Sequence, residues 1–479
     1  MIAAAVGSLT SACAVGPDFR PAAAPAMTHY RAALPQADAQ AAGEGQHLIM
    51  GADIPERWWE QFHSPALNTL VQRALSANPT IDAARAALRA AQETSAAQRG
   101  AFWPQIGASV TPTRQRTADS LSSPLNAPVN PFSLHTAQLN IGYSLDVFGG
   151  MRRQVEALDA QTEFQRFELE AARLSLAANV VAAAVQEASL RGQLAAMERI
   201  VALDGDMLGL IRRQFALGAI AESGVVAQEA ALAQALAALP PLRKQLAQTR
   251  DLLTALIGEL PDKELEQQFA LDDLALPREL PLSLPSRLVE QRPDVRASQA
   301  LAAAASAQVG VAFANRLPQF GINASLGSTA TRAADLFKSG GGFWSLAGAV
   351  TQPLFDGGAL AHRQSAAEAN YDQALAQYRA TVIGAFQNVE DTLHALAQDT
   401  DALRAATAAE RAAWHSLDIA RHQARLGDTS YLALLGAEQP YQQALLALVQ
   451  ARANRLADTA ALFQALGGGW RQSGSAGKQ

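Results

Sequence analysis

The sequence predicts a mixed α/β membrane protein built from two tandem structural repeats, each with short amphipathic strands and one very long helix. Apolar and polar residues alternate from 136 to 147, which is the period of a β-strand with one apolar face. After Gly149 and Gly150 the period becomes helical, and no proline interrupts residues 151–217. At about 1.5 Å per residue this helix would be on the order of 100 Å long, which is more than a globular domain needs. The same order of strand, glycines and long helix returns at 343–427, so we expect the design to occur twice.

Matching landmarks keep a nearly constant spacing between the two halves. Pro79 and Pro293 are 214 residues apart, and Gly218 and Gly427 are 209 residues apart. This regularity predicts a duplication with changes confined to the connections. The expected organisation is a truncated signal peptide at 1–12, an extended leader at 13–57, a first repeat at 58–258, a proline-rich connector at 259–285, a second repeat at 286–470 and a polar tail at 471–479.

The elements of the two repeats follow one order. In the first repeat we expect a helix at 65–99, a strand at 105–111, a loop at 113–132, a strand at 136–147, a helix at 151–217 and a helix at 223–258 that Pro240 and Pro241 kink or split. In the second we expect a helix at 286–315, a strand at 318–328, a loop at 329–342, a strand at 343–355, a long helix ending at 426 and a helix at 431–466. The second long helix has a coiled-coil spacing of apolar residues, formed by Leu375, Tyr378, Val382, Val389, Leu393, Leu396, Leu403, Trp414 and Leu417.

The four strands have the length of membrane-spanning β-strands, about ten residues each. No run of about 18 consecutive apolar residues suggests a spanning helix, so a bilayer would have to be crossed by a closed barrel. Because a barrel needs roughly eight strands, the barrel must be shared between chains, and a dimer, a trimer and a tetramer all satisfy this count. The apolar strand faces are expected to meet lipid and the polar faces a lumen, with aromatic residues near the strand ends at Phe102, Trp103, Phe320, Phe343, Trp344 and Phe355.

Composition narrows the function class. The formal net charge of -6 argues against a dedicated nucleic-acid-binding protein, which would show basic stripes. The eight histidines are scattered, without a His-Glu-x-x-His pair, and no phosphate-binding glycine loop or serine elbow is present. His415 and His422 share one helix face and are interpreted as surface residues. We therefore expect no enzyme, no cofactor and no metal site.

The single cysteine, Cys13, follows a short apolar run that ends in small residues. This pattern is typical of a signal-peptide cleavage site, and it predicts either an acylated mature N-terminus or a free thiol in a flexible leader. No Lys or Arg precedes Cys13, so residues 1–12 are expected to be the remainder of a longer signal peptide.

Taken in order, several motifs make the chain resemble the TolC-like outer-membrane efflux channels, and most closely their lipoprotein branch, which serves resistance-nodulation-division (RND) pumps. The resemblance implies a homotrimer with a 12-stranded barrel in the outer membrane of a Gram-negative bacterium and an α-helical tunnel through the periplasm. It also implies a lipid anchor on Cys13, a periplasmic adaptor protein and an inner-membrane RND pump as partners. The motifs are Cys13 to Pro21, Trp58-Trp59 with Phe62, Leu284-Pro285-Ser286, Arg292-Pro293-Asp294-Val295, Gly427 to Leu432 and Ala465 to Trp470.

The resemblance also implies where the partner docks, at two helix-turn-helix tips. In similar channels a ring of aspartates narrows the entrance beside the second tip, but here the matching positions are Ala433 and Gly436. Glu222 and Asp428 are the candidate replacement charges, and Pro440 predicts a kink nearby. The implied tip and docking residues are Phe215, Leu217, Gly218, Ala219, Arg425, Leu426, Gly427, Asp428, Ser430 and Tyr431.

These observations lead to one main hypothesis, a passive trimeric exit duct for drugs or other small toxic compounds. The alternatives are a duct for type I protein secretion and a periplasmic coiled-coil scaffold without a pore. In a duct of this kind the pump selects the substrate, so the sequence of the duct does not define it.

Overall fold

The computed structural model describes residues 14–21, 30, 46–116, 131–283, 285–426 and 431–470. The chain forms two compact units, one from residues 1–22, 87–166 and 297–379, the other from 23–86, 167–296 and 380–479. The principal elements are β1 (His47–Met50), α2 (Pro65–Ala77), α3 (Pro79–Arg99), β2 (Gln105–Gln115), β3 (Phe132–Leu145), α4 (Gly150–Ala216), α5 (Glu222–Leu256), β4 (Glu279–Leu282), α6 (Pro285–Gln291), α7 (Pro293–Ala314), β5 (Gln319–Ala330), β6 (Gly342–Thr351), α8 (Ala359–Leu426) and α9 (Tyr431–Ala465). The predicted mixed α/β class is confirmed.

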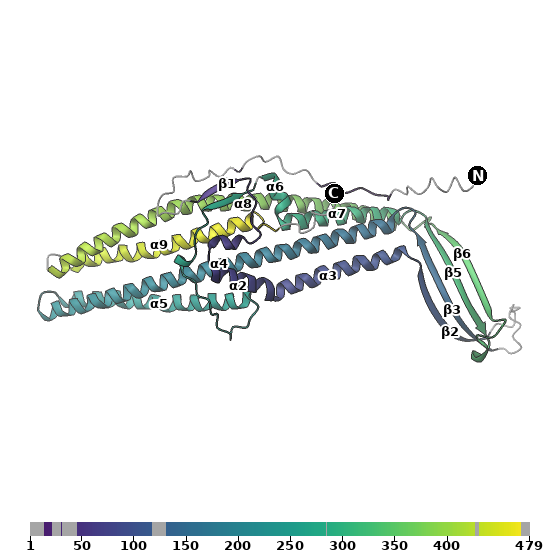
Figure 1. Ribbon diagram of the computed structural model, residues 1–479, viewed down its shortest axis with the longest axis horizontal. Helices are drawn as coiled ribbons and strands as arrows, with labels where there is room; N and C mark the ends of the chain where they lie inside the picture. The colour runs from purple at the N-terminus through teal and green to yellow at the C-terminus, as the bar shows by residue number, and fades with distance from the viewer. Residues whose placement is uncertain are drawn as a thin grey trace. The chain divides into compact units, whose positions relative to one another are not determined.

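The first unit contains a four-stranded antiparallel sheet in the order β2-β3-β5-β6 (Figure 1). Its register aligns apolar residues across the strands: Leu139 pairs with Ala108 on one side and with Leu326 on the other. Leu326 in turn pairs with Trp344. Since paired residues point to the same face, the alternation seen in each strand becomes one continuous apolar face.

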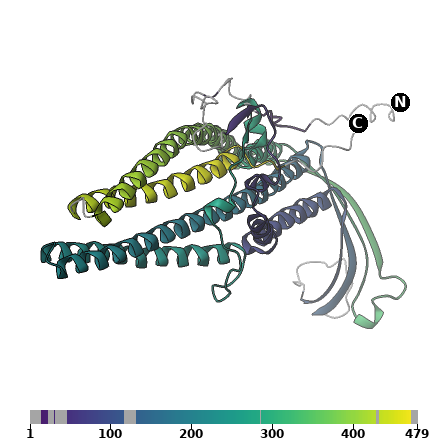
Figure 2. The ribbon, with the colours of Figure 1, turned by 60° about the vertical axis from the view of Figure 1, so that its left-hand side comes forward.

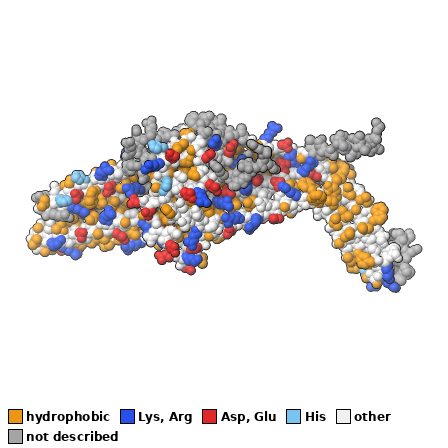
Figure 3. Space-filling view, viewed as in Figure 1, with side chains coloured by type: hydrophobic (Ala, Val, Ile, Leu, Met, Phe, Trp, Pro, Cys, Tyr) orange, Lys and Arg blue, Asp and Glu red, His pale blue; other side chains and the backbone are white. Residues whose placement is uncertain are grey.

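The two faces of this sheet differ in chemistry. The apolar face is exposed, with 69% of Ile106 and 68% of Leu346 accessible to solvent, and hydrophobic side chains gather over the strands in Figure 3. The opposite face is joined by polar contacts, such as the Asn140 Nδ2 donation to Ser109 Oγ at 3.3 Å. An exposed apolar face of this extent requires an apolar environment.

The second unit is built around two helical hairpins, residues 167–216 of α4 with α5 and residues 380–426 of α8 with α9 (Figures 1 and 2). The apolar ladder predicted on α8 is largely confirmed, because Val389 and Leu417 are fully buried. Trp414 departs from it: 43% of this side chain is exposed, and its ring lies 5.2 Å from that of Tyr441.

The predicted helix at 65–99 is wrong as a single element, because it breaks at Asn78. A residue before proline is disfavoured in the α region, and Asn78, which precedes Pro79, is extended with φ -72° and ψ 125°. Its Oδ1 accepts from Thr80 N at 2.8 Å, which caps α3. The helix predicted at 286–315 breaks in the same way at Arg292, before Pro293. The two repeats therefore share this device as well.

Pro240 and Pro241 were predicted to kink or split this helix, and the split is wrong, because α5 is one helix across both prolines. The carbonyls that lose their intrahelical partners belong to Leu236 and Ala237, four residues earlier. Both residues are exposed, so water can reach these carbonyls.

A short strand pair was not predicted from the sequence. β1, in the leader, pairs in parallel with β4, in the connector, from His47 opposite Glu279 to Met50 opposite Leu282. By length and composition, α5 and α7 are also apolar enough to span a membrane. Half of the most apolar 18-residue stretch of α7 is buried within the protein. Their richness in alanine accounts for this, and core helices of soluble proteins pass the same test.

Candidate functional site: the hairpin tip and the leader

The turn between α4 and α5 closes the first hairpin at Gly218. Gly218 has φ +72°, and its N–H donates to Phe215 O at 2.9 Å. Ala219 N donates to Gln214 O, also at 2.9 Å. This pair of bonds is the Schellman arrangement, which satisfies the last helix carbonyls and requires a left-handed residue that only glycine adopts without strain.

The tips expose apolar side chains. Leu217 is 84% exposed and Phe215 is 44% exposed on the first hairpin, and Leu426, at the end of α8, is 76% exposed. Beneath them lies a cluster that packs helices of both hairpins together, composed of Met207, Ile211, Leu417, Ala420, Leu434, Ala437 and Tyr441. Exposed leucines over a packed core are typical of a surface that meets another protein.

The structure describes only some of the candidate charges and other residues at the tips. Glu222 is exposed in the first turn of α5, where a carboxylate is favoured by the helix dipole. Gly427, Asp428 and Ser430 lie outside the described residues. Arg425 lies in the last turn of α8, and Tyr431 is the first residue of α9. Ala433 and Gly436 are exposed, which leaves the positions of the family's aspartate ring uncharged.

Below the tips lies a group of side chains that the sequence analysis missed. We call Asp204, Gln228, Arg421 and Glu438 the polar layer, since each comes from a different helix: α4, α5, α8 and α9. The signal was available, because Asp204 interrupts an apolar helical stripe formed by Ile200, Met207 and Ile211.

The leader residues directly after Cys13 dock onto the first unit. Val15 N donates to Phe148 O at 3.1 Å, and the buried Arg153 donates from Nε to Val15 O at 3.0 Å. Gly310 allows this approach, because a Cβ at that position would lie 2.8 Å from Val15 O. Cys13 itself lies outside the described residues. Its neighbour is therefore held beside the junction between β3 and α4.

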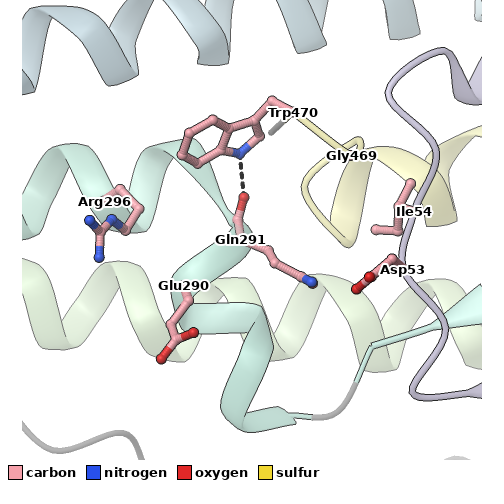
Figure 4. Close-up of a pocket in the computed structure, with 7 residues that line it drawn as sticks. All are labelled: Asp53, Ile54, Glu290, Gln291, Arg296, Gly469 and Trp470. Atoms are coloured by element: carbon pink, nitrogen blue, oxygen red, sulfur yellow. Dashed lines mark hydrogen bonds between the residues drawn. The ribbon is translucent and has the colours of Figure 1, made fainter. Parts of the chain in front are cut away.

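A cavity of about 510 Å³ in the second unit is lined by Asp53, Ile54, Glu290, Gln291, Arg296, Gly469 and Trp470 (Figure 4). The Trp470 indole donates to the Gln291 carbonyl, and the Arg296 guanidinium lies 5.2 Å from the centre of the Phe167 ring. Because these contacts attach the C-terminal segment to α6 and join α7 to α4, we interpret the cavity as structural. In the described part of the chain, no group of three or more His, Cys, Asp or Glu residues is placed to hold a metal. His415 and His422 are exposed, as predicted.

Replacing Gly218 tests the tip turn. Gly218→Ala is expected to destabilise the turn by about 1 kcal/mol, because alanine pays a steric cost at positive φ. Gly209→Ala is the matched control, since Gly209 lies inside α4 with no neighbouring atom within 4 Å of an added Cβ. There alanine should stabilise the helix by about 0.5–1 kcal/mol. Hydrogen exchange at the tip amides measures both effects, and a shift of the same sign in the two variants would contradict the assignment.

Comparison with known proteins places these features in a family context. The sequence model described as "Outer membrane efflux protein" matches residues 70–259 and 284–468. The chain is 30% identical over 431 residues to the pyoverdine export outer membrane protein OpmQ of Pseudomonas aeruginosa, covering 87% of this chain and 88% of the relative. It is 28% identical over 473 residues to the toluene efflux pump outer membrane protein TtgC of Pseudomonas putida, covering 98% and 95%.

Solved structures agree with the sequence comparisons. The outer-membrane channel OprN superposes with a TM-score of 0.85 at 28% identity, covering 96% of this chain and all of that chain. The open state of the MtrE outer membrane channel of Neisseria gonorrhoeae gives a TM-score of 0.82 at 25% identity, covering 95% and 98%.

Proposed function

Because the chain belongs to the outer membrane efflux protein family, we propose that three copies of it form the exit duct of a tripartite RND-type pump. The chain is an outer-membrane channel component of an efflux system and not an enzyme. The proposal concerns the assembly, its partners and its lipid anchor.

One observation carries the proposal: an antiparallel sheet with one exposed apolar face, one polar face and two outer strands. β2 and β6 each have only one neighbour in the described sheet, so each has a free edge. Unpaired backbone groups are not tolerated in lipid, and four strands are too few for closure. Pairing β2 of one copy with β6 of the next removes every edge, and three copies give twelve strands.

The strand-to-helix junctions support a lumen that continues from the barrel into the helices. Asp146 accepts from Met151 N at 2.9 Å and from Arg152 N at 3.0 Å, which caps the start of α4. Asp356 accepts from Leu360 N at 2.8 Å at the start of α8. Each repeat therefore fixes its long helix directly after a strand, which suits a rigid continuous wall.

The exposed tips support docking to a periplasmic adaptor, which would connect the duct to the inner-membrane pump. Leu217 and Leu426 supply apolar contact area, and the polar entrance charge is left to Glu222 and Asp428. The relatives are named for the export of pyoverdine, toluene and antibiotics, which differ widely in chemistry. We infer that the pump and not the duct selects the substrate.

The docked leader supports lipid attachment at Cys13. Arg153 and Phe148 hold residues 14–18 at the end of the membrane sheet, so an acyl chain on the preceding residue would start beside the bilayer. Labelling with radioactive palmitate tests this. Incorporation should be complete in the natural chain and absent in Cys13→Ser.

Extraction of the membranes tests the assembly. The duct predicts that only detergent releases the protein, that it elutes with the mass of three chains, and that the oligomer dissociates on heating in SDS. Release by high salt as a monomer would instead support the coiled-coil scaffold.

A further inference from the structure

The polar layer lies buried between the two hairpins, close below their tips. Asp204 is 1% exposed, Glu438 is 2% exposed and Gln228 is fully buried. Arg421 Nη2 lies 3.7 Å from Glu438 Oε1, too far for a strong bond, and Gln228 Nε2 donates to the backbone carbonyl of Asp204 at 3.2 Å. Both carboxyl groups are therefore shielded from water, and both are near members of the apolar cluster in the chain: Glu438 follows Ala437, and Asp204 lies about one helical turn before Met207.

Neither carboxylate is satisfied in its ionised form. Among the described residues, all four carboxylate oxygens of Asp204 and Glu438 lack a hydrogen-bond donor. The two groups come close enough to bond to each other once one of them carries a proton, because a carboxylic acid can donate where a carboxylate cannot. A shared proton removes one buried charge and satisfies one acceptor at the same time.

The electrostatics of the site agree with this geometry. Burial raises the pKa of Glu438 to about 7, and the adjacent Asp204 charge contributes in the same direction, whereas the Arg421 guanidinium opposes it. Burial also raises the pKa of Asp204, whereas the neighbouring Gln228 amide, the Glu438 carboxyl group and the Arg421 charge act to lower it. The pair therefore holds one proton below about pH 7.

We propose that a proton shared by Asp204 and Glu438 holds the α4–α5 hairpin against the α8–α9 hairpin, so that their packing near the tips responds to pH. The pair acts as a switch between a packed state, which the structure shows, and a separated state in which water reaches both carboxylates. In the proposed exit duct, this switch would make transport depend on pH. Only that effect on transport rests on the proposed function, because the packing of the hairpins can respond to pH without it.

Other titratable groups near the layer are solvated or satisfied by neighbours. On α4 and α5, Arg212 pairs with Glu229 at 2.7 Å on the exposed surface. On α8, His422 is 65% exposed beside Asp418, so water solvates this side chain. On α9, Tyr441 is buried in the apolar cluster.

The sign of the effect follows from linkage. The packed state holds the proton more tightly than the separated state, in which Glu438 returns to its ordinary pKa of 4.5. The bound proton therefore contributes its full stabilisation of the packed state below about pH 4.5. This stabilisation decreases as the pH rises and is lost at about pH 7. Between these values the ratio of packed to separated molecules falls by up to about tenfold per pH unit, since one proton is released.

Distance measurements between the tips test the switch. Spin labels on Leu217→Cys and Leu426→Cys report the separation of the hairpins, because both positions are exposed. The full chain is assembled with excess unlabelled chain, so that each oligomer carries one labelled copy, and unlabelled oligomers treated with the same reagent give the background. As the pH rises from 4.5 to 8.5 the short distance should give way to a longer one, with the change complete by about pH 7. Glu438→Gln, which stays neutral and can donate, should keep the short distance throughout.

Two matched variants show whether the polar layer is responsible. Glu229→Gln removes an exposed carboxylate of α5. Asp399→Asn removes a carboxyl group that lies beside Asp458 within the α8–α9 hairpin, and burial raises the pKa of this group to about 7. Both should titrate like the natural chain. The proposal would be overturned if Glu438→Gln titrated like the natural chain, or if the distance in the natural chain did not depend on pH. It would also be overturned if Ca²⁺ restored the short distance at pH 8, because a cation and not a proton would then join the two carboxylates.

Single-channel recordings separate this inference from the proposed function. If the distances titrate but the oligomer conducts no ions, the switch stands and the duct is wrong. If ions are conducted while the distances stay fixed between pH 4.5 and 8.5, the duct stands and the switch is wrong.

Discussion

Leu139→Arg is expected to prevent membrane insertion. Leu139 lies in the middle of β3 on the apolar face, paired with Ala108 and Leu326, and it is 44% exposed. An arginine facing lipid at the bilayer midplane costs about 2–4 kcal/mol, and a trimer would carry three of them. We expect heat-modifiable oligomer in the outer-membrane fraction to fall by at least tenfold, as measured on gels of fractionated membranes.

Asn140→Arg is the matched control, because the next residue of the same strand points to the opposite face. Asn140 bonds to Ser109 across the polar face, where a lumen would hydrate an arginine. This variant should insert normally and alter only ion selectivity. Equal insertion of the two arginine variants would contradict the assignment of the faces, as would loss of insertion in Asn140→Arg alone.

Glu187→Ala is expected to destabilise the helical unit by up to about 3–5 kcal/mol, because it leaves two partly buried guanidinium groups without their anion. Glu187 is fully buried in α4, and its Oε1 accepts from Arg191 Nε at 2.9 Å and from Arg250 Nη1 at 2.8 Å. Arg250 also donates to the carbonyls of Gln267 and Leu265, so it cannot easily turn to solvent. Thermal unfolding followed by helical circular dichroism should show a lowered Tm.

Glu198→Ala gives the comparison for an ion pair in water. Glu198 lies 3.2 Å from Arg243, and both side chains are more than half exposed. Such pairs contribute about 0–1 kcal/mol, so Tm should barely change. Similar losses in the two variants would show that Glu187 does not hold the second unit together.

Periodicity was sufficient to predict most of the fold. The alternation around Leu139 and the uninterrupted helix after Gly150 are local signals, and duplication reinforces them. The breaks at Asn78 and Arg292 were also readable, because each precedes a proline. The pairing of β1 with β4 could not be predicted, since four residues are too few to show a period. In addition, His47 pairs with Glu279, which lies 232 positions away in the sequence.

The candidate site was predicted in part. Gly218 was identified from its place between helical patterns, and its positive φ gives the physical reason. The polar layer escaped notice because Asp204 and Glu438 come from distant helices, and their burial depends on how the hairpins pack. A single charged residue in an apolar stripe was the local clue, but only tertiary structure shows which partner it meets.

The proposed three-copy duct is tested most directly by blocking its lumen one chain at a time. Asn140→Cys places a thiol on the polar face of β3, and Leu139→Cys places one on the apolar face. In planar bilayers, a charged water-soluble thiol reagent should lower the single-channel conductance of Asn140→Cys in three equal steps. The natural channel, which retains Cys13, and the Leu139→Cys channel should be unaffected. Absence of conductance, two or four steps, or equal block of Leu139→Cys would contradict a trimeric channel lined by this face.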